Sequence, residues 1–64
     1  MKIVRGMIST QSKDDNQHHL NGTVCIVEDD NSDVVRVHFT SGVVHNMRIQ
    51  RHKLVFFTIL GDSK

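Results

Sequence analysis

Short runs of β-branched residues, separated by polar turn-forming segments, are the feature that most constrains how this chain can fold. Valine is its commonest residue and alanine is absent. β-Branched side chains favour strands, because they pack well on a pleated surface. No window places apolar residues at helical spacing between recognisable helix caps. We therefore expect an all-β protein.

Length is the second constraint. A chain of 64 residues has room for one small domain, which we take as residues 1–64. Its single cysteine, Cys25, cannot form an internal disulfide, and no secretory signal pattern is present, so we expect a reducing, cytoplasmic location. The longest apolar run, Val24 to Val27, is far too short to cross a membrane, and we expect no membrane partner.

The alternation of apolar runs and turns predicts five strands. We expect them at residues 2–8, 23–28, 34–40, 43–49 and 53–60. Gly6 interrupts the first strand and indicates a β-bulge or the close approach of another backbone. A long polar loop covers residues 9–21, a single 3₁₀ turn is expected at residues 50–52, and the tail at residues 61–64 should fray.

The hydrophobic pattern places the hairpin between the third and fourth strands. A two-residue loop of Ser41 and Gly42 would bring Asn46 and Arg48 to the core face. A loop of Thr40, Ser41 and Gly42 turns the other face of the fourth strand toward the core, and we prefer this loop. The mostly apolar face that it creates consists of Val35, Val37, Phe39, Val43, His45, Met47 and Ile49.

Two segments carry a resemblance to a known fold. A strand rich in valine follows glycine at residues 22–27, and after an acidic turn a second strand at residues 35–39 leads into a Ser-Gly turn. With the long first loop and the 3₁₀ turn before Leu54, these segments resemble the SH3-like small β-barrels of the KOW and Tudor-like type. The resemblance implies a five-stranded barrel with a binding face bordered by the first loop and the 3₁₀ region.

The sequence offers no set of residues suited to catalysis. Cys25 lies in an apolar run, where a thiol packs as a small hydrophobe and lacks a nearby base. The acids at residues 14–15 and 28–30 lie in polar turns, where we expect water to leave them ordinary. The five histidines lack paired cysteines at zinc-ligand spacing. We expect no enzyme activity, no metal and no cofactor.

Two features indicate binding. Basic residues gather around the expected 3₁₀ turn, and they either border a binding face or merely keep the apolar last strand soluble. That strand is apolar on both sides, so one of its phenylalanines is left for an interface unless the long first loop folds over it. The predicted partner-binding residues are Arg36, Arg48, Arg51, Lys53, Phe56 and Phe57.

The sequence therefore favours a non-catalytic protein-interaction module. By analogy with small accessory regulators, we expect it to dock on a larger bacterial or phage protein and to form a homodimer through its last strand. The alternative is a KOW-type nucleic-acid-binding module that uses Arg48, Arg51 and Lys53 on phosphates. A net charge of +1 and the lack of Tyr and Trp for base stacking favour a protein partner, so no specific nucleic-acid binding is expected.

Overall fold

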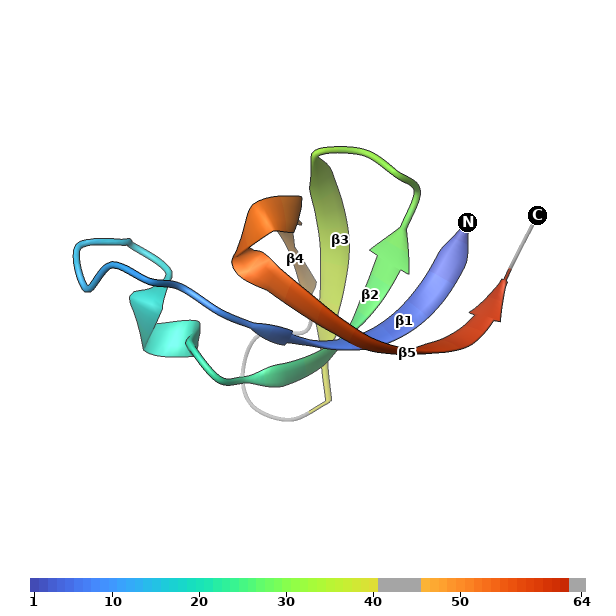
Figure 1. Ribbon diagram of the computed structural model, residues 1–64, viewed down its shortest axis with the longest axis horizontal. Coiled ribbons are helices and arrows are strands. Elements are labelled where there is room, and N and C mark those ends of the chain that lie inside the picture. Colours follow the sequence, from blue (N-terminus) through green and yellow to red (C-terminus); the bar gives the residue numbers. More distant parts are fainter. Residues whose placement is uncertain (41–45, 63–64) are drawn as a thin grey trace.

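The computed structural model describes residues 1–40 and 46–62 of the chain. Its elements are β1 (Lys2–Ile8), η1 (His18–Leu20), β2 (Val24–Asp29), β3 (Val34–Phe39), β4 (Asn46–Gln50), η2 (Arg51–Lys53) and β5 (Leu54–Asp62), where η1 and η2 are 3₁₀ turns. The strands form one antiparallel sheet in the order β4-β3-β2-β1-β5 (Figure 1). The expected all-β, five-stranded architecture is confirmed. Within the described ranges no helix is long and apolar enough to span a membrane.

The sheet is not closed into a barrel. β4 and β5 are its two edges, and no strand pairing joins them in the described residues. Figure 1 shows the sheet curling, with η2 carrying the chain from β4 across to β5. β5 uses one side to pair along β1 from Lys2 to Ile8, and its other side is left as an edge. The closed barrel expected from the sequence is therefore corrected to an open sheet.

The hydrophobic core lies on one face of this sheet. Side chains alternate between the two faces along a strand, so every second residue points toward the core. The buried apolar residues follow this period and are Val4, Ile8, Cys25, Val27, Val35, Val37 and Ile49. The partly buried residues that pack against them are Leu20, Phe39, Met47, Leu54 and Phe56. Cys25 is thus part of the core, as its apolar run indicated.

Gly6 allows β5 to approach β1 closely. A Cβ atom at this position would lie 2.7 Å from the backbone oxygen of Val55. The pairing of β1 with β5 also shifts register beside it, between Arg5 and Gly6, and again between Ile3 and Val4. The bulge or close approach that Gly6 indicated in the sequence is confirmed in both respects.

β5 extends further than the sequence indicated. Gly61 pairs with Ile3 and Asp62 with Lys2, so these two residues belong to the sheet rather than to a frayed tail. The Asp62 carboxylate also lies 3.6 Å from the N-terminal ammonium group. Pairing with the first residues of β1 holds this end of the strand in place. The other two residues of the expected tail, 63–64, lie outside the described residues.

β3 and β4 meet on the predicted faces in a different register. Val35 lies opposite Ile49 and Val37 opposite Met47, whereas a loop confined to residues 40–42 would place both pairs two residues earlier on β4. A shift of two residues leaves every side chain on its own face, so the hydrophobic pattern could not reveal it. Outside the described residues lie four members of the predicted loop and face, Ser41, Gly42, Val43 and His45.

Hydrogen bonds hold the long first loop to the end of β1 and join residues within the loop. The Gly22 amide donates to the oxygen of Ile8 at 2.7 Å, and Gly22 has a φ of 86°, a conformation that suits glycine. Thr10 is buried; its amide donates to Asn21 Oδ1 at 2.9 Å and its hydroxyl lies 2.7 Å from His18 Nδ1. The loop therefore contains ordered polar contacts and the turn η1 within a segment expected to be a simple polar loop.

Candidate interaction surface

An ion pair between Arg51 and Asp29 lies where η2 meets the end of β2. The guanidinium donates two hydrogen bonds to the carboxylate, from Nη1 to Oδ1 and, at 3.0 Å, from Nη2 to Oδ2. The Arg51 amide also donates to the oxygen of Asp33 at 2.6 Å, which fixes the start of η2 against the acidic turn. Asp29 is only 5% exposed, whereas Arg51 is 37% exposed. The pair thus joins a buried acid to a cation that reaches the surface.

The two partners hold each other in their charged forms. The hydrogen bonds from Arg51 lower the pKa of Asp29 against the opposing effect of burial, and the amide of Asn31, 3.0 Å from Asp29 Oδ1, lowers it further. Hydrogen bonding to Asp29 in turn raises the pKa of Arg51. Both groups are therefore ionised at neutral pH.

Arg51 also contacts the last strand. Its guanidinium carbon lies 5.0 Å from the ring centroid of Phe56, within the range of a cation–π interaction. Phe56 packs against the core, so the guanidinium is held between a buried carboxylate and a half-buried aromatic ring. Such an arginine has little conformational freedom left to lose on binding.

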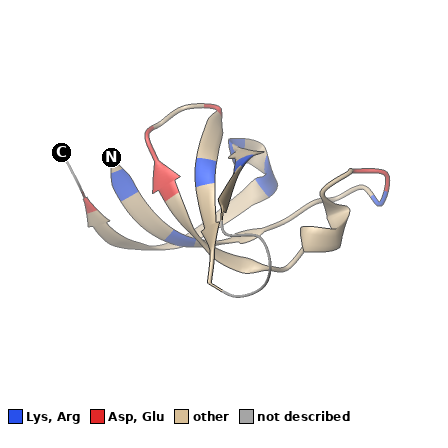
Figure 2. Cartoon of the chain, turned by 180° about the vertical axis from the view of Figure 1, so that it is seen from behind, with Lys and Arg blue, Asp and Glu red and all other residues tan. Residues whose placement is uncertain are grey.

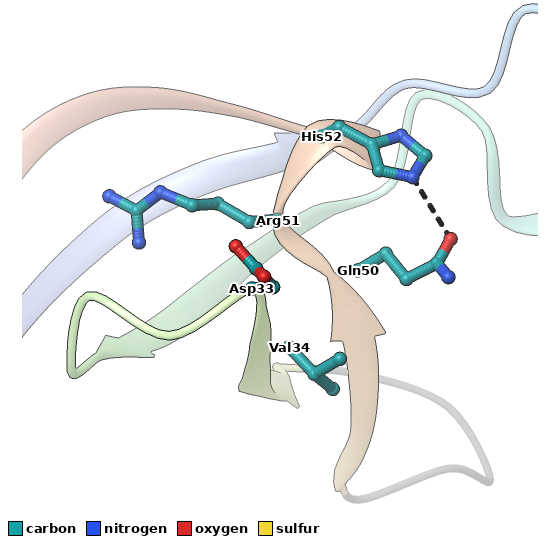
Figure 3. Close-up of a pocket in the computed structure, with 5 residues that line it drawn as sticks. All are labelled: Asp33, Val34, Gln50, Arg51 and His52. Carbon is teal, nitrogen blue, oxygen red and sulfur yellow. Dashed lines mark hydrogen bonds between the residues drawn. The ribbon is translucent and has the colours of Figure 1, made fainter.

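Two hollows adjoin Arg51. One, of about 390 Å³, is lined by Asp33, Val34, Gln50, Arg51 and His52 (Figure 3). In that view His52 and Gln50 turn toward each other, joined by a 3.0 Å hydrogen bond, while Arg51 extends past Asp33. The second hollow, of about 280 Å³, is lined by Lys2, Val4, Asp29, Arg51, Phe56, Phe57, Thr58 and Ile59. We call the two hollows together the Arg51 surface.

The second cation of the predicted basic cluster, Lys53, is directed toward the first loop. Its ammonium lies 2.9 Å from Asp15 Oδ2 and 3.2 Å from Gln17 Oε1, and its side chain is 17% exposed. The backbone amide of Gln17 and the Lys53 ammonium lower the pKa of Asp15. Lys53 therefore holds the loop against η2.

Arg36 and Arg48 lie away from the Arg51 surface. They face each other across β3 and β4, on the side of the sheet opposite the core, and both are exposed. Neither side chain has an ion pair or hydrogen bond with another described residue. They share a small hollow of about 180 Å³ with Met1, Glu28 and Asp30. Figure 2 shows the basic residues spread over several elements and the first loop rather than confined to one segment of the chain.

β5 presents the main exposed apolar surface. Phe57 is 52% exposed, whereas Phe56 packs on the core, so Phe57 is the phenylalanine left for an interface. Val55, Ile59 and Leu60 are exposed on the same strand. The first loop leaves these side chains uncovered, which rules out the alternative that it folds over the strand. Because β5 is an edge, the backbone groups on its outer side also have no strand partner in the described residues.

Other residues that the sequence offered as candidates for catalysis or metal binding are buried or paired in the structure. Burial raises the pKa of the Cys25 thiol to about 11, which removes its nucleophilic form at neutral pH. His38 pairs with Glu28 on the outer face of the sheet. Within the described ranges, no three His, Cys, Asp or Glu side chains are grouped so that they could hold a metal ion.

Sequence reasoning missed Asp29 and Asp15, which it treated as ordinary turn carboxylates. For Asp29 a signal was present, because Cys25, Val27 and Asp29 share one strand face at a spacing of two, so an acid there must point to the core side and requires a partner. Asp15 carried no such signal, since its partner Lys53 lies 38 residues further along the chain. Searches of known protein families, curated proteins and solved structures find no match to this chain.

Proposed function

We propose that this chain is a small, non-catalytic protein-interaction module, an accessory regulator that docks on a larger bacterial or phage protein. The supporting observation is the Arg51 surface, in which a rigidly held arginine lies between two hollows and beside exposed apolar side chains of β5. Arginine and aromatic residues dominate the binding energy of many protein interfaces, above all where they are fixed before binding. The single cysteine, which has no partner for an internal disulfide, supports a cytoplasmic location.

The arrangement of elements supports an SH3-like relationship in an open form. Five strands, a long first loop and a 3₁₀ turn before the last strand are what the KOW and Tudor-like resemblance implies. η2 forms part of the Arg51 surface, in agreement with a binding face at the 3₁₀ region. The long loop contributes indirectly, because Asp15 and Gln17 hold Lys53 and thereby η2.

The KOW-type nucleic-acid function remains the second candidate and has weaker support. Of its three proposed phosphate-binding residues, Arg51 is paired with Asp29 and Lys53 with Asp15. A phosphate would have to compete with a carboxylate at both positions. Arg48 is left, with Arg36 beside it, and two contacts give a log–log salt slope of only about 2 on duplex DNA. Specific binding to nucleic acid is therefore not expected.

An affinity capture with matched variants tests the docking function. The tagged protein is incubated with bacterial lysate, with and without nuclease, and captured proteins are compared between wild type, His52→Glu and His19→Glu. Both histidines are exposed in 3₁₀ turns, but only His52 lines the Arg51 surface. We expect a protein that resists nuclease and is lost with His52→Glu only. Loss on nuclease treatment would favour the nucleic-acid function, and equal capture by both variants would contradict docking at this surface.

A further inference from the structure

Apart from the irregularities in its pairing with β1, the outer edge of β5 lacks the features that normally protect an edge strand. Edges are commonly short, charged, interrupted by proline or covered by another element. β5 has nine residues, contains no proline, and carries no charged side chain between Leu54 and Gly61. Phe57 and Ile59 are 52% and 60% exposed at its centre. Some other strand is therefore expected to cover this edge.

The chain's own first loop is too far away to do so. Figure 1 shows the loop projecting from the Ile8 end of β1, beyond the start of β5. It is fixed there, because the Ser9 amide donates to the oxygen of Lys53 at 2.7 Å and Lys53 binds Asp15. No described segment of this chain pairs with the outer side of β5, so a strand of another molecule can occupy it.

A second copy of this chain fits the edge by its charge pattern. When β5 pairs antiparallel with itself, an uncharged segment meets an uncharged segment, and no like charges enter the ladder. In the centred register Thr58 meets Thr58 of the second copy, a favourable cross-strand pair, and the two Asp62 carboxylates lie at opposite ends of the interface. The same pairing of β4, the other edge, would place Arg48 against Arg48 and is disfavoured.

We propose that two copies of this chain associate through antiparallel pairing of β5 with β5, so that their sheets join into one. The contact is the same surface on both subunits, so it closes on itself as a dimer rather than growing into a filament. Phe57 and Ile59 of each copy are covered in the interface. This inference does not depend on docking to a larger protein at the Arg51 surface, because it requires only the purified chain.

Sedimentation velocity over a concentration series tests the proposal. The wild type should pass from monomer to dimer. Phe57→Glu and Ile59→Glu, which place a carboxylate in the joined sheet, should weaken dimerisation by at least about tenfold. Val24→Glu is the matched control, because Val24 is 50% exposed on the inner strand β2, and it should dimerise like the wild type. Circular dichroism on each variant identifies any that has unfolded.

Two results would overturn the dimer. One is a wild type that stays monomeric at every concentration; the other is a dimer that survives both β5 substitutions in folded protein. The use of two positions keeps the test decisive if one variant fails to fold. A monomeric protein that still captures its partner in a His52-dependent manner would reject the dimer alone and leave the docking function standing.

Discussion

Asp29 shows how one buried acid organises a surface. It lies on the core face of β2, where an ionised carboxylate without partners would be costly. Arg51 supplies two hydrogen bonds and the amide of Asn31 a third, so burial of the acid determines where the guanidinium is held. The same residues fix the position of the two hollows beside Arg51. Stability and the proposed binding surface thus rest on one ion pair.

Acid should weaken the fold through this pair and through Asp15. Both carboxylates have a lowered pKa in the folded chain, Asp29 chiefly because of Arg51 and Asp15 chiefly because of the Gln17 amide. Their contribution to stability is present above the pKa of an unfolded aspartate, about 3.9, and is lost as the pH falls through the folded values. We expect the free energy of unfolding, measured with urea, to decrease steadily below about pH 4.

Asp29→Asn provides the control for this acid dependence. The substitution removes the titrating group while keeping a similar shape, so the slope of stability against pH below about pH 4 should become shallower. Its stability at neutral pH should fall, because Arg51 then faces an uncharged amide. An unchanged slope in the variant would mean that Asp29 is not held in its charged form by the fold.

At the scale of elements, the β1–β5 pair depends on the absence of a side chain at Gly6. Gly6→Ala would place a Cβ atom 2.7 Å from the backbone oxygen of Val55, so one strand must move. We expect a loss of about 1–3 kcal/mol in the free energy of unfolding, as is typical when a packed site is overfilled. Gly61→Ala is the matched control on the partner strand, because nothing lies within 4 Å of the added atom.

Urea unfolding of the two glycine variants gives a direct comparison. Gly61→Ala should leave the unfolding midpoint close to that of the wild type, while Gly6→Ala lowers it. If both variants were equally stable, the close approach of β5 at Gly6 would not exist in solution. The β1–β5 pairing would then need a different register.

The elements themselves could largely be predicted from the sequence, because each depends on local pattern. Alternation indicated the core face of β3, and Gly6 marked the irregular pairing. Features set by distant residues could not be predicted. The ends of β5 depend on Ile3 and Lys2, which pair with Gly61 and Asp62, and the pairing of β3 with β4 is offset by two residues without any change of face.

For the candidate site, the sequence showed which residues are of a type suited to binding. It did not show which of them have side-chain partners within the fold. Arg51, Lys53, Phe56 and Phe57 were all expected at a binding face, but charge counted along the chain does not show which cations are already paired. Lys53 is neutralised by Asp15 across the fold, whereas Arg36 and Arg48 lie together on the other side of the sheet. Of the two phenylalanines, Phe57 is exposed on β5 and Phe56 packs against the core.

At the scale of the whole molecule, the open sheet has two unlike edges. β4 is short, with Arg48 at its centre and a polar residue at each end, while β5 is long, apolar and uncharged until Asp62. Closure into a barrel would have given the backbone groups of both edge strands hydrogen-bond partners. Because the sheet stays open, we expect intermolecular contact to concentrate on the β5 side, where the second hollow of the Arg51 surface also lies.

A dilution series followed by NMR tests this asymmetry most directly. Amide proton and nitrogen shifts of the labelled chain are recorded from high to low concentration, without any partner. We expect the amides of Val55, Phe57 and Ile59 to shift with concentration, while those of β4 stay fixed. Shifts centred on β4, or none at any position, would contradict an interaction surface at β5.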